Sequence, residues 1–479
     1  MGYHEIYCLI CNVSFAIARI RTLNEPPDAS WGCCGITTRK NEFVKVEDLE
    51  YGNEFGEEDS EMESDEEYED ELGGCGDGCM MAVWPWDGTE SIAGNSSYNP
   101  HSLHPTEEMY YRRVKNHPEE VRPQIWARLI GGNPVRLEHI AGPDCESESG
   151  YNGHLISVEE MRGCNTMQGL ILKDPDWEPE DGDEEFERSG RYYLTGLQDA
   201  NTNLDAYDSC TPTRHGCYSV LPASYSDDTD EIMGNNAKPV YHYSLPVHPT
   251  CLEVLKRVHL RRYGHAGIDK FLMWWELGVK KRALPKDPCR IDASHGRDQY
   301  WLHNTGAEYL AANPLFVPGL EKIFRLADTA PLSEGGKRNY NVEDEVFAVL
   351  PTELRRMIFD YLSRDEITKL HHASPLLYRN AMMDLGDSFM KEHPWLWEYW
   401  TELPYSTWAL TTATELQESI ESPVKQLIAS RSIDWGSVMR MFWNGEQSGR
   451  LKGLRNRGRI WKVCDMILDK VEEHHPLVS

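Results

Sequence analysis

The sequence predicts an α+β fold, with a mixed α+β N-terminal and middle region followed by an all-α segment and a Trp-rich helical C-terminal region. Two observations indicate this class. Short aromatic runs at residues 191–194 and 239–243 favour extended backbone, because aromatic side chains pack well on a pleated surface. Beyond residue 345, apolar residues recur every three to four positions, which is the helical period. With 479 residues, of which 40% are hydrophobic, the chain is long enough for two or three domains.

The charge and the cysteines restrict the partners and the compartment. A formal net charge of -31 argues against binding to nucleic acids or to an anionic membrane, since phosphate would be repelled, and it favours a basic protein partner. The 13 cysteines are an odd number without regular spacing, which indicates a reducing compartment, cytoplasm or nucleus. No basic residue precedes the semi-apolar stretch 6–17, and no run approaches about 18 apolar residues, so neither a signal peptide nor a membrane span is expected.

The N-terminal segment, residues 1–56, contains one cysteine pair with the spacing of metal ligands. Cys8 and Cys11 are separated by two residues, and a tetrahedral zinc site would need two more ligands, for which the candidates are His4, Cys33 and Cys34. The alternative is a β-strand whose cysteines are small buried apolar residues. One pair is weaker than a two-pair zinc signature, so we expect no cofactor, or zinc at less than one equivalent.

Other cysteines and histidines have ligand-like spacing in weaker sequence contexts. They are Cys75 with Cys79, His248 with Cys251, and Cys289 with His295. The first pair follows an acidic run, and the other two lie in aromatic-rich surroundings that favour an interpretation as core side chains. The sequence contains no phosphate-binding lysine loop, no metalloprotease motif, no nucleophile elbow and no dinucleotide fingerprint, so an enzyme is not expected.

Two acidic segments differ in their aromatic content. Residues 57–71 hold eleven Asp or Glu and no Lys or Arg, a composition that cannot bury enough apolar area to offset chain entropy. We therefore expect a disordered acidic linker over residues 57–80, either a solvated spacer or a docking strip for a basic partner. Residues 174–187 are also acidic, but Trp177 and Phe186 can anchor them as an ordered surface loop.

The α+β domain is assigned to residues 81–330. Within it, a strand end is expected to lead into a helix near residues 155–161, because Ser157 and Glu160 have the spacing of a capping box. A later helix is expected to open at His248, where a proline follows at the first helical position and apolar residues then recur at helical spacing.

The C-terminal part follows a Pro- and Gly-containing hinge at residues 331–344. Residues 393–479 contain seven of the 15 Trp, which indicates a large buried area. Helical spacing near residues 438–442 and 460–468 predicts two further helices. The basic cluster at 450–462 is interpreted as a solvated helix end, with neutralisation of the acidic linker or phosphate binding as alternatives.

Residues 345–392 predict three short helices. Pro351 has the fixed φ that suits a first helical turn, and Ser363 and Ser374 can cap the two helices that follow. A unit of this size is too small to bury a large core by itself. We therefore expect part of its apolar surface to pack against a neighbouring region or a partner. One face of the first helix is expected to carry five apolar residues: Leu354, Met357, Ile358, Tyr361 and Leu362.

This stretch, which opens with Leu350-Pro351, resembles an F-box of the fungal type near residues 345–390. The Cys and Trp that are common late in many F-boxes are replaced here by residues 371–375, which are similar to the Ala-Ser variant of fungal F-box proteins. The resemblance implies docking on a Skp-type adaptor and a cullin complex, and hence a substrate-recognition subunit of a cullin-RING ubiquitin ligase. The residues that it assigns to adaptor binding are Leu350, Pro351, Leu354, Ile358, Leu362, Ile367 and Leu370.

An alternative is a zinc-stabilised interaction protein without a ubiquitin-ligase role, in which the three helices are only internal core. Stoichiometric metal without adaptor binding would favour it. The hinge further leads us to expect that residues 331–479 fold apart from residues 1–330, which would recognise the still unidentified substrate.

Overall fold

The computed structural model contains both helices and strands, which confirms the mixed character of the fold. Among the residues that it describes, no helix is both long and apolar enough to cross a membrane. The described residues are 6–26, 29–31, 44–45, 78–85, 135–180, 183–199, 211–212, 219–222, 243–280, 303–329, 389–409, 435–447 and 451–474, with scattered residues between 350 and 449.

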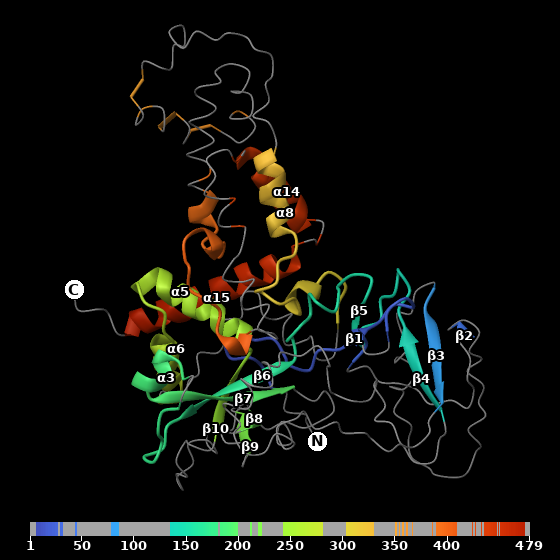
Figure 1. The fold of residues 1–479 in the computed structure, drawn as a ribbon, viewed down its shortest axis with the longest axis horizontal. Coiled ribbons are helices and arrows are strands. Elements are labelled where there is room, and N and C mark those ends of the chain that lie inside the picture. Colours follow the sequence, from blue (N-terminus) through green and yellow to red (C-terminus); the bar gives the residue numbers. More distant parts are fainter. Residues whose placement is uncertain are drawn as a thin grey trace.

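A five-stranded sheet lies in the lower part of the molecule in Figure 1, in the order β7-β6-β10-β9-β8. β6 pairs antiparallel with β7 and β10, and β10 runs parallel to β9. Close approach of β6 and β10 requires a glycine, because a Cβ on Gly169 would lie 2.4 Å from the Ser244 Cβ. The strands are β6 (Thr166–Leu172), β7 (Tyr192–Asp199), β8 (Thr211–Pro212), β9 (Ser219–Pro222) and β10 (Tyr243–Val247).

Three helices pack together above this sheet: α5 (Pro249–Tyr263), α6 (Asp269–Lys280) and α15 (Lys452–His474) (Figure 1). α5 begins where the sequence predicts, with His248 as N-cap and a proline in its first turn. It ends at Gly264, whose φ of 79° is the left-handed conformation that glycine adopts without strain. Arg262 of α5 forms ion pairs with Asp469 and Glu472, so α5 and α15 are joined by charge as well as by apolar contact.

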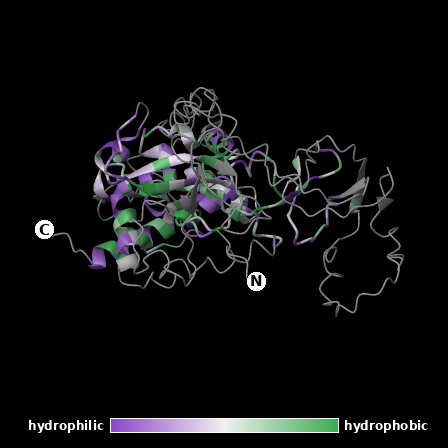
Figure 2. Cartoon of the chain, turned by 90° about the horizontal axis from the view of Figure 1, so that it is seen from below, coloured by the Kyte–Doolittle hydropathy of each residue, from purple (hydrophilic) through white to green (hydrophobic). Residues whose placement is uncertain are grey.

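One hydrophobic core joins segments that are far apart in the sequence. Leu9 and Phe15 from the N-terminal segment pack in the same cluster as Leu255 of α5, Phe271 of α6 and Ile467 of α15. In Figure 2 the hydrophobic, green stretches gather in the part of the molecule that holds the sheet and these helices. This argues against the expected separate folding of residues 331–479, because α15 belongs to the core that the upstream residues build. The segment boundaries themselves stay predictions.

A second apolar cluster lies above the first and involves α8 (Leu320–Thr329) and α14 (Trp435–Gln447) (Figure 1). Phe324, Phe389 and Phe442 make edge-on ring contacts there, with the centroids of Phe389 and Phe442 5.2 Å apart. The helices expected near residues 438–442 and 460–468 are confirmed as α14 and α15.

Two small sheets extend from the body. β1 (Arg19–Ile20) pairs in parallel with β5 (Tyr151–Asn152), and β3 (Met80–Pro85) pairs antiparallel with β2 (Val44–Lys45) and β4 (Val135–Ile140). Residues 79 and 80 were expected at the end of the acidic linker. Met80 instead begins β3, and Cys79 directly precedes this strand and is only 3% exposed. The rest of that linker, residues 57–77, lies outside the described residues.

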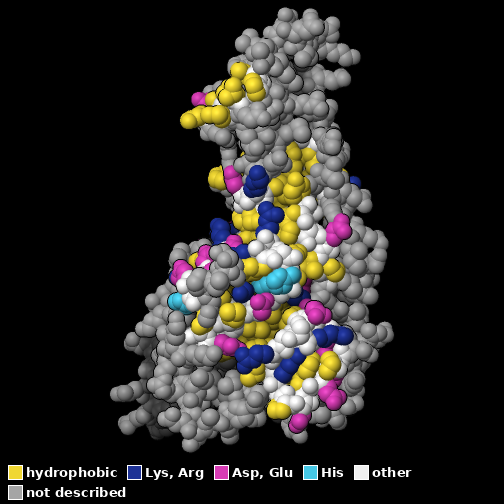
Figure 3. All heavy atoms as spheres, turned by 90° about the vertical axis from the view of Figure 1, so that its left-hand side faces the viewer, with side chains coloured by type: hydrophobic (Ala, Val, Ile, Leu, Met, Phe, Trp, Pro, Cys, Tyr) yellow, Lys and Arg dark blue, Asp and Glu magenta, His cyan; other side chains and the backbone are white. Residues whose placement is uncertain are grey.

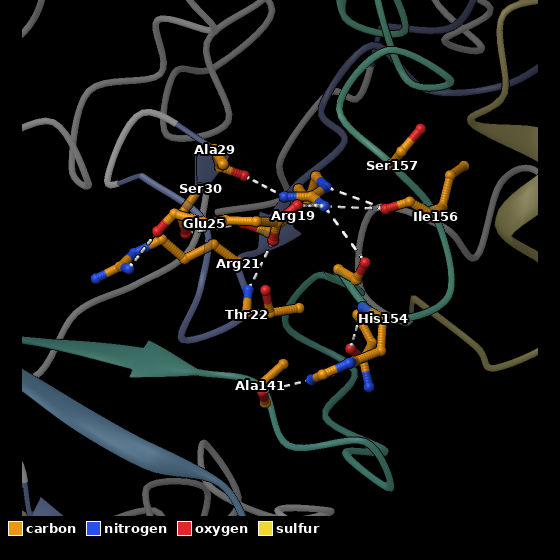
Figure 4. Close-up of polar contacts among 12 residues, drawn as sticks. Arg19, Arg21, Thr22, Glu25, Ala29, Ser30, Ala141, His154, Ile156 and Ser157 are labelled. Atoms are coloured by element: carbon orange, nitrogen blue, oxygen red, sulfur yellow. Dashed lines mark hydrogen bonds and ion pairs between the residues drawn. The ribbon is translucent and has the colours of Figure 1, made fainter.

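Arg19 fastens the N-terminal segment to the rest of the body (Figure 4). Its buried guanidinium pairs with Glu25 at 2.6 Å and donates to the carbonyl oxygens of Ala29 at 2.5 Å and Ile156 at 3.0 Å. The buried charge of Arg19 is tolerated only while all of these partners are present, because loss of one partner leaves the charge uncompensated. The network fixes the path of the chain on both sides of β1.

The expected helix at residues 155–161 is wrong, although its capping hydrogen bonds are present. The Ser157 N–H donates to Glu160 Oε2 at 2.9 Å, and the Glu160 N–H donates to Ser157 Oγ at 3.2 Å. These bonds close a series of turns rather than a helix, because Gly163 adopts a φ of 78° and the chain enters β6. A capping box is a local signal that also suits a tight turn.

Elements near the sheet agree better with the sequence. Residues 191–194 fall largely in β7, whereas of the expected strand 239–243 only the last residue is described, at the start of β10. Trp177 anchors the acidic segment, since the Lys173 ammonium lies 3.6 Å from its ring centroid. The remaining short elements are α3 (Glu185–Ser189), η5 (Glu308–Leu310), η8 (Trp397–Tyr399) and η9 (Thr407–Ala409).

The basic cluster at residues 450–462 is not a solvated helix end throughout, and this interpretation is corrected for two of its arginines. Arg457 is fully buried in α15, where it pairs with Glu398 at 2.9 Å and lies over the Trp397 ring at 3.9 Å. Arg459 is 7% exposed and donates to the carbonyl oxygen of Cys11 at 2.8 Å. Both guanidinium groups therefore bind other parts of the same chain.

Candidate metal centre

The described cysteines are all buried and none forms a disulfide bond. Four buried side chains form one group of metal-ligating atoms: Cys8, Cys11, His248 and Cys251, whose ligand atoms all lie within 4.8 Å of one another. We refer to these residues as the four-ligand cluster. It joins the sequence-predicted pair to a His and a Cys that the sequence had assigned to the core.

A tight turn presents the first two ligands. Tyr7 and Ser14 pair across this turn, and the Cys8 N–H donates to the Val13 carbonyl at 3.0 Å. Asn12 closes the turn with a φ of 55°, a left-handed conformation that asparagine tolerates better than most residues. The short expected strand therefore folds back on itself, and both thiols are directed to one side.

The start of α5 presents the other two ligands. His248 is the N-cap and Cys251 lies three residues further on, and side chains at this spacing share one face of a helix. The two halves meet through the backbone, because the Leu9 N–H donates to the Pro246 carbonyl at 2.9 Å. The backbone N–H of His248 also donates to Cys8 Sγ, at 3.3 Å.

The distances match a tetrahedral metal site. His248 Nδ1 lies 3.4 Å from Cys11 Sγ and 3.6 Å from Cys251 Sγ. With Zn–S near 2.3 Å and Zn–N near 2.0–2.1 Å, the N to S edge of a tetrahedron measures about 3.6 Å. Three thiols and one imidazole are also a common ligand set of structural zinc sites. The group could therefore hold a metal ion such as zinc.

The surroundings prepare these side chains for a cation. The other ring nitrogen of His248, Nε2, donates to the Cys164 carbonyl at 2.8 Å, so Nδ1 is the nitrogen that faces the thiols. Burial, together with the hydrogen bonds to Cys11 and Cys8, raises the pKa of the Cys251 thiol, so a cation that binds here would have to displace its proton. The hydrogen bond from Arg459 to the Cys11 carbonyl holds the turn from the side of α15.

Mutual contacts also shift the pKa values inside the cluster. Burial opposes a Cys11 thiolate, but hydrogen bonds from Cys251 and Cys8 and the charge of His248 outweigh it and lower the pKa of Cys11. Burial opposes an imidazolium as well, yet electrostatic interactions and hydrogen bonds with Cys8 and Cys11 raise the pKa of His248 to about 10. Thiolate and imidazolium stabilise each other here, and a divalent cation would take the place of the shared protons.

The site is closed, which favours a structural over a catalytic role. The four side chains are 0–5% exposed. The cavity beside them has a volume of about 20 Å³, room for one water molecule rather than for a substrate. A Cys-His pair that acts as a nucleophile needs access for its substrate, and structural zinc sites need none.

A group formed by His259, His265 and Asp269 is a weaker candidate. His265 and Asp269 are exposed. The Nδ1 atom of His259 donates to the His265 carbonyl at 2.9 Å, and its Nε2 lies 3.0 Å from Asp269. Hydrogen bonding thus accounts for this arrangement without a metal.

The residues assigned to adaptor binding lie elsewhere. Leu354 and Ile358 are helical, as expected, and Leu350, Ile358 and Leu362 are partly buried, whereas Pro351 and Leu354 are exposed. Ile367 and Leu370 lie outside the described residues, as do the zinc candidates His4, Cys33 and Cys34.

Sequence reasoning missed the pairing of the two halves of the cluster. The available signal was the match between two short motifs, Cys-x-x-Cys at residue 8 and His-x-x-Cys at residue 248, of which the second begins a helix. The 237 residues that separate Cys11 from His248 hid this match.

No protein-family model, no curated protein and no solved structure matches this chain.

Proposed function

We propose that this chain is an adaptor protein without an active site of its own, a substrate-recognition subunit of a cullin-RING ubiquitin ligase. An F-box near residues 345–390 docks on a Skp-type adaptor, and the transfer chemistry belongs to other subunits. The formal net charge of -31 favours a basic protein substrate.

The observation that supports docking is the exposure of large apolar side chains at helical spacing. Leu354, Met357 and Tyr361 are 46%, 55% and 86% exposed, and we call them the docking patch. Residues three and four positions apart lie on one face of a helix. In Figure 1 the described residues of this stretch lie at the upper end of the molecule, and Figure 3 shows hydrophobic side chains on the surface there. Apolar side chains grouped on a surface favour cover by a protein partner.

The second part of the proposal concerns the metal. The four-ligand cluster binds one zinc ion, which links the turn at residues 8–11 to the first turn of α5. The support is the agreement of its N to S distances with a zinc tetrahedron, together with the bond from His248 Nε2 to the Cys164 carbonyl. The role is structural, because the ligands are closed off from solvent.

Docking is tested with the double variant Leu354→Asp, Met357→Asp in the full-length protein. Loss of anchors of this kind commonly costs 2 kcal/mol or more, roughly a thirtyfold loss of affinity. Calorimetric titration with a purified Skp-type adaptor measures this change. The matched control is Leu326→Asp on α8, because Leu326 is 52% exposed and lies outside the docking patch. If the folded double variant binds the adaptor with unchanged affinity, the F-box proposal is contradicted.

The metal part is tested with two substitutions of one residue. His248→Ala removes a ligand and should abolish binding of this zinc, whereas His248→Cys creates a four-thiol set and should retain it. Elemental analysis of the purified proteins gives the stoichiometry. Equal zinc content in both variants would show that His248 is not a ligand.

Both measurements on the wild-type protein separate the two functional hypotheses. Bound zinc together with adaptor affinity supports the proposal as stated. Bound zinc without adaptor affinity favours the alternative, a zinc-stabilised interaction protein with no role in a ubiquitin ligase.

A further inference from the structure

Cys79, His139 and Cys145 form a second group of metal-ligating atoms, apart from the four-ligand cluster. Their ligand atoms lie within 4.8 Å of one another, and the three residues are 3%, 7% and 4% exposed. They adjoin the β2-β3-β4 sheet. No residue is shared with the first cluster, so the two groups are independent.

The strand register explains why the first two of these side chains meet. Met81 of β3 lies opposite His139 of β4. Cys79 precedes Met81 by two residues and so faces the same side, because side chains alternate along an extended chain. A turn after β4 brings in the third ligand, with the Cys145 N–H donating to the Gly142 carbonyl at 3.2 Å.

Neighbouring polar groups hold this turn in place. The Asn152 side-chain amide donates to the carbonyls of Gly142 at 3.0 Å and Cys145 at 3.2 Å. His154 Nε2 donates to the Ala141 carbonyl at 3.2 Å, a contact that Figure 4 shows. The turn is therefore fixed by the same region that binds Arg19, and its ligands are positioned before any metal arrives.

The donor set and its spacing suit a soft divalent cation. Cys145 Sγ lies 3.7 Å from His139 Nε2, close to the edge of about 3.6 Å of a zinc tetrahedron. The Gly142 N–H donates to Cys79 Sγ at 3.4 Å, which holds this thiol beside the turn after β4. Thiolate and imidazole together select zinc over the hard cations magnesium and calcium.

We propose that Cys79, His139 and Cys145 supply three ligands of a second zinc centre. The ion would link the start of β3 to β4 and its following turn, where the local apolar cluster is small and consists of Ile20, Cys79, Ala141 and Cys145. This proposal does not depend on the F-box or on the first zinc site. A zinc ion in place of a larger core is a common way to stabilise so small a unit.

Zinc stoichiometry of the full-length protein tests the proposal. We expect two equivalents in the wild type and one in the double variant Cys79→Ala, Cys145→Ala. His139→Ala should also lose one equivalent, while His139→Cys retains two. Cys464→Ala is the matched control for a buried cysteine outside both groups, and it should keep two. A zinc content that is the same in the wild type and in the Cys79 and Cys145 double variant would overturn the second centre.

A measurement without substitutions covers the case in which a variant does not fold. Wild-type protein is alkylated before and after zinc removal by a strong chelator, and mass spectrometry follows Cys79 and Cys145. Protection that is lost together with the second equivalent of zinc supports the proposal. Modification before chelation, continued protection after complete zinc removal, or a disulfide between the two cysteines would contradict it.

Discussion

The four-ligand cluster and the docking patch stand in opposite relations to solvent. The cluster joins two segments of the chain, and its side chains are 0–5% exposed. The patch belongs to one short helical stretch, and its side chains are 46–86% exposed. Substitution in the first is therefore expected to lower the stability of the fold, while substitution in the second is expected to lower affinity for a partner.

The largest effect is expected for Cys8→Ala together with Cys11→Ala. Structural zinc contributes about 10–16 kcal/mol of binding free energy in small zinc-finger peptides, so loss of the ion should lower the free energy of unfolding by several kcal/mol. Chemical denaturation followed by circular dichroism measures this, with Cys464→Ala as the control. If both proteins unfold at the same denaturant concentration, the cluster does not hold the body together.

His303 is a second buried histidine that contacts the N-terminal segment, and its effect on stability can be compared with that of the four-ligand cluster. His303 accepts from the Ala18 N–H at 3.0 Å and donates to the Glu148 carbonyl at 2.8 Å. Burial lowers its pKa from 6.5 to about 4. The unfolded chain therefore binds this proton first as the pH falls, so stability declines between pH 6.5 and about 4.

The size of this decline is about 3 kcal/mol for the single group. His303→Gln removes the titration while keeping an amide that can donate and accept. The difference between the pH profiles of wild type and variant isolates the contribution of His303 from that of other groups. Parallel profiles over this pH range would contradict a buried neutral His303.

The smallest effect on stability is expected at the docking patch. Tyr361→Ala should change the free energy of unfolding by less than about 0.5 kcal/mol, because the side chain is 86% exposed. The same substitution should weaken adaptor binding, since it removes apolar contact area from the partner. Thermal unfolding and adaptor titration of one preparation give both numbers. A large loss of stability with intact binding would place Tyr361 in the core instead.

Local patterns predicted several elements of the fold. The helix after His248 and the apolar faces of α14 and α15 were predictable, because capping and helical periodicity involve residues within a few positions of one another. The hydrogen bonds between Ser157 and Glu160 also form, but the helix that their spacing predicts does not. The adaptor-docking role stays a prediction.

Solvation of charged groups was harder to predict. The sequence favoured solvated arginines near residues 450–462, whereas Arg457 is buried against Glu398 and Trp397. A charge enters the interior only where partners from other segments compensate it, and such partners have no fixed spacing in the sequence.

Residue types and local spacing specify the chemistry of the ligands and where each local motif begins: a cysteine pair at residues 8 and 11, and a helix start at His248. Which motifs meet depends on how the chain packs. Cys11 and His248 are 237 residues apart, and Cys79 reaches His139 through the register of two strands. Periodicity reports on neighbours along the chain, whereas a metal site needs donors that converge in space, and the shared core and the sheet pairing bring them together.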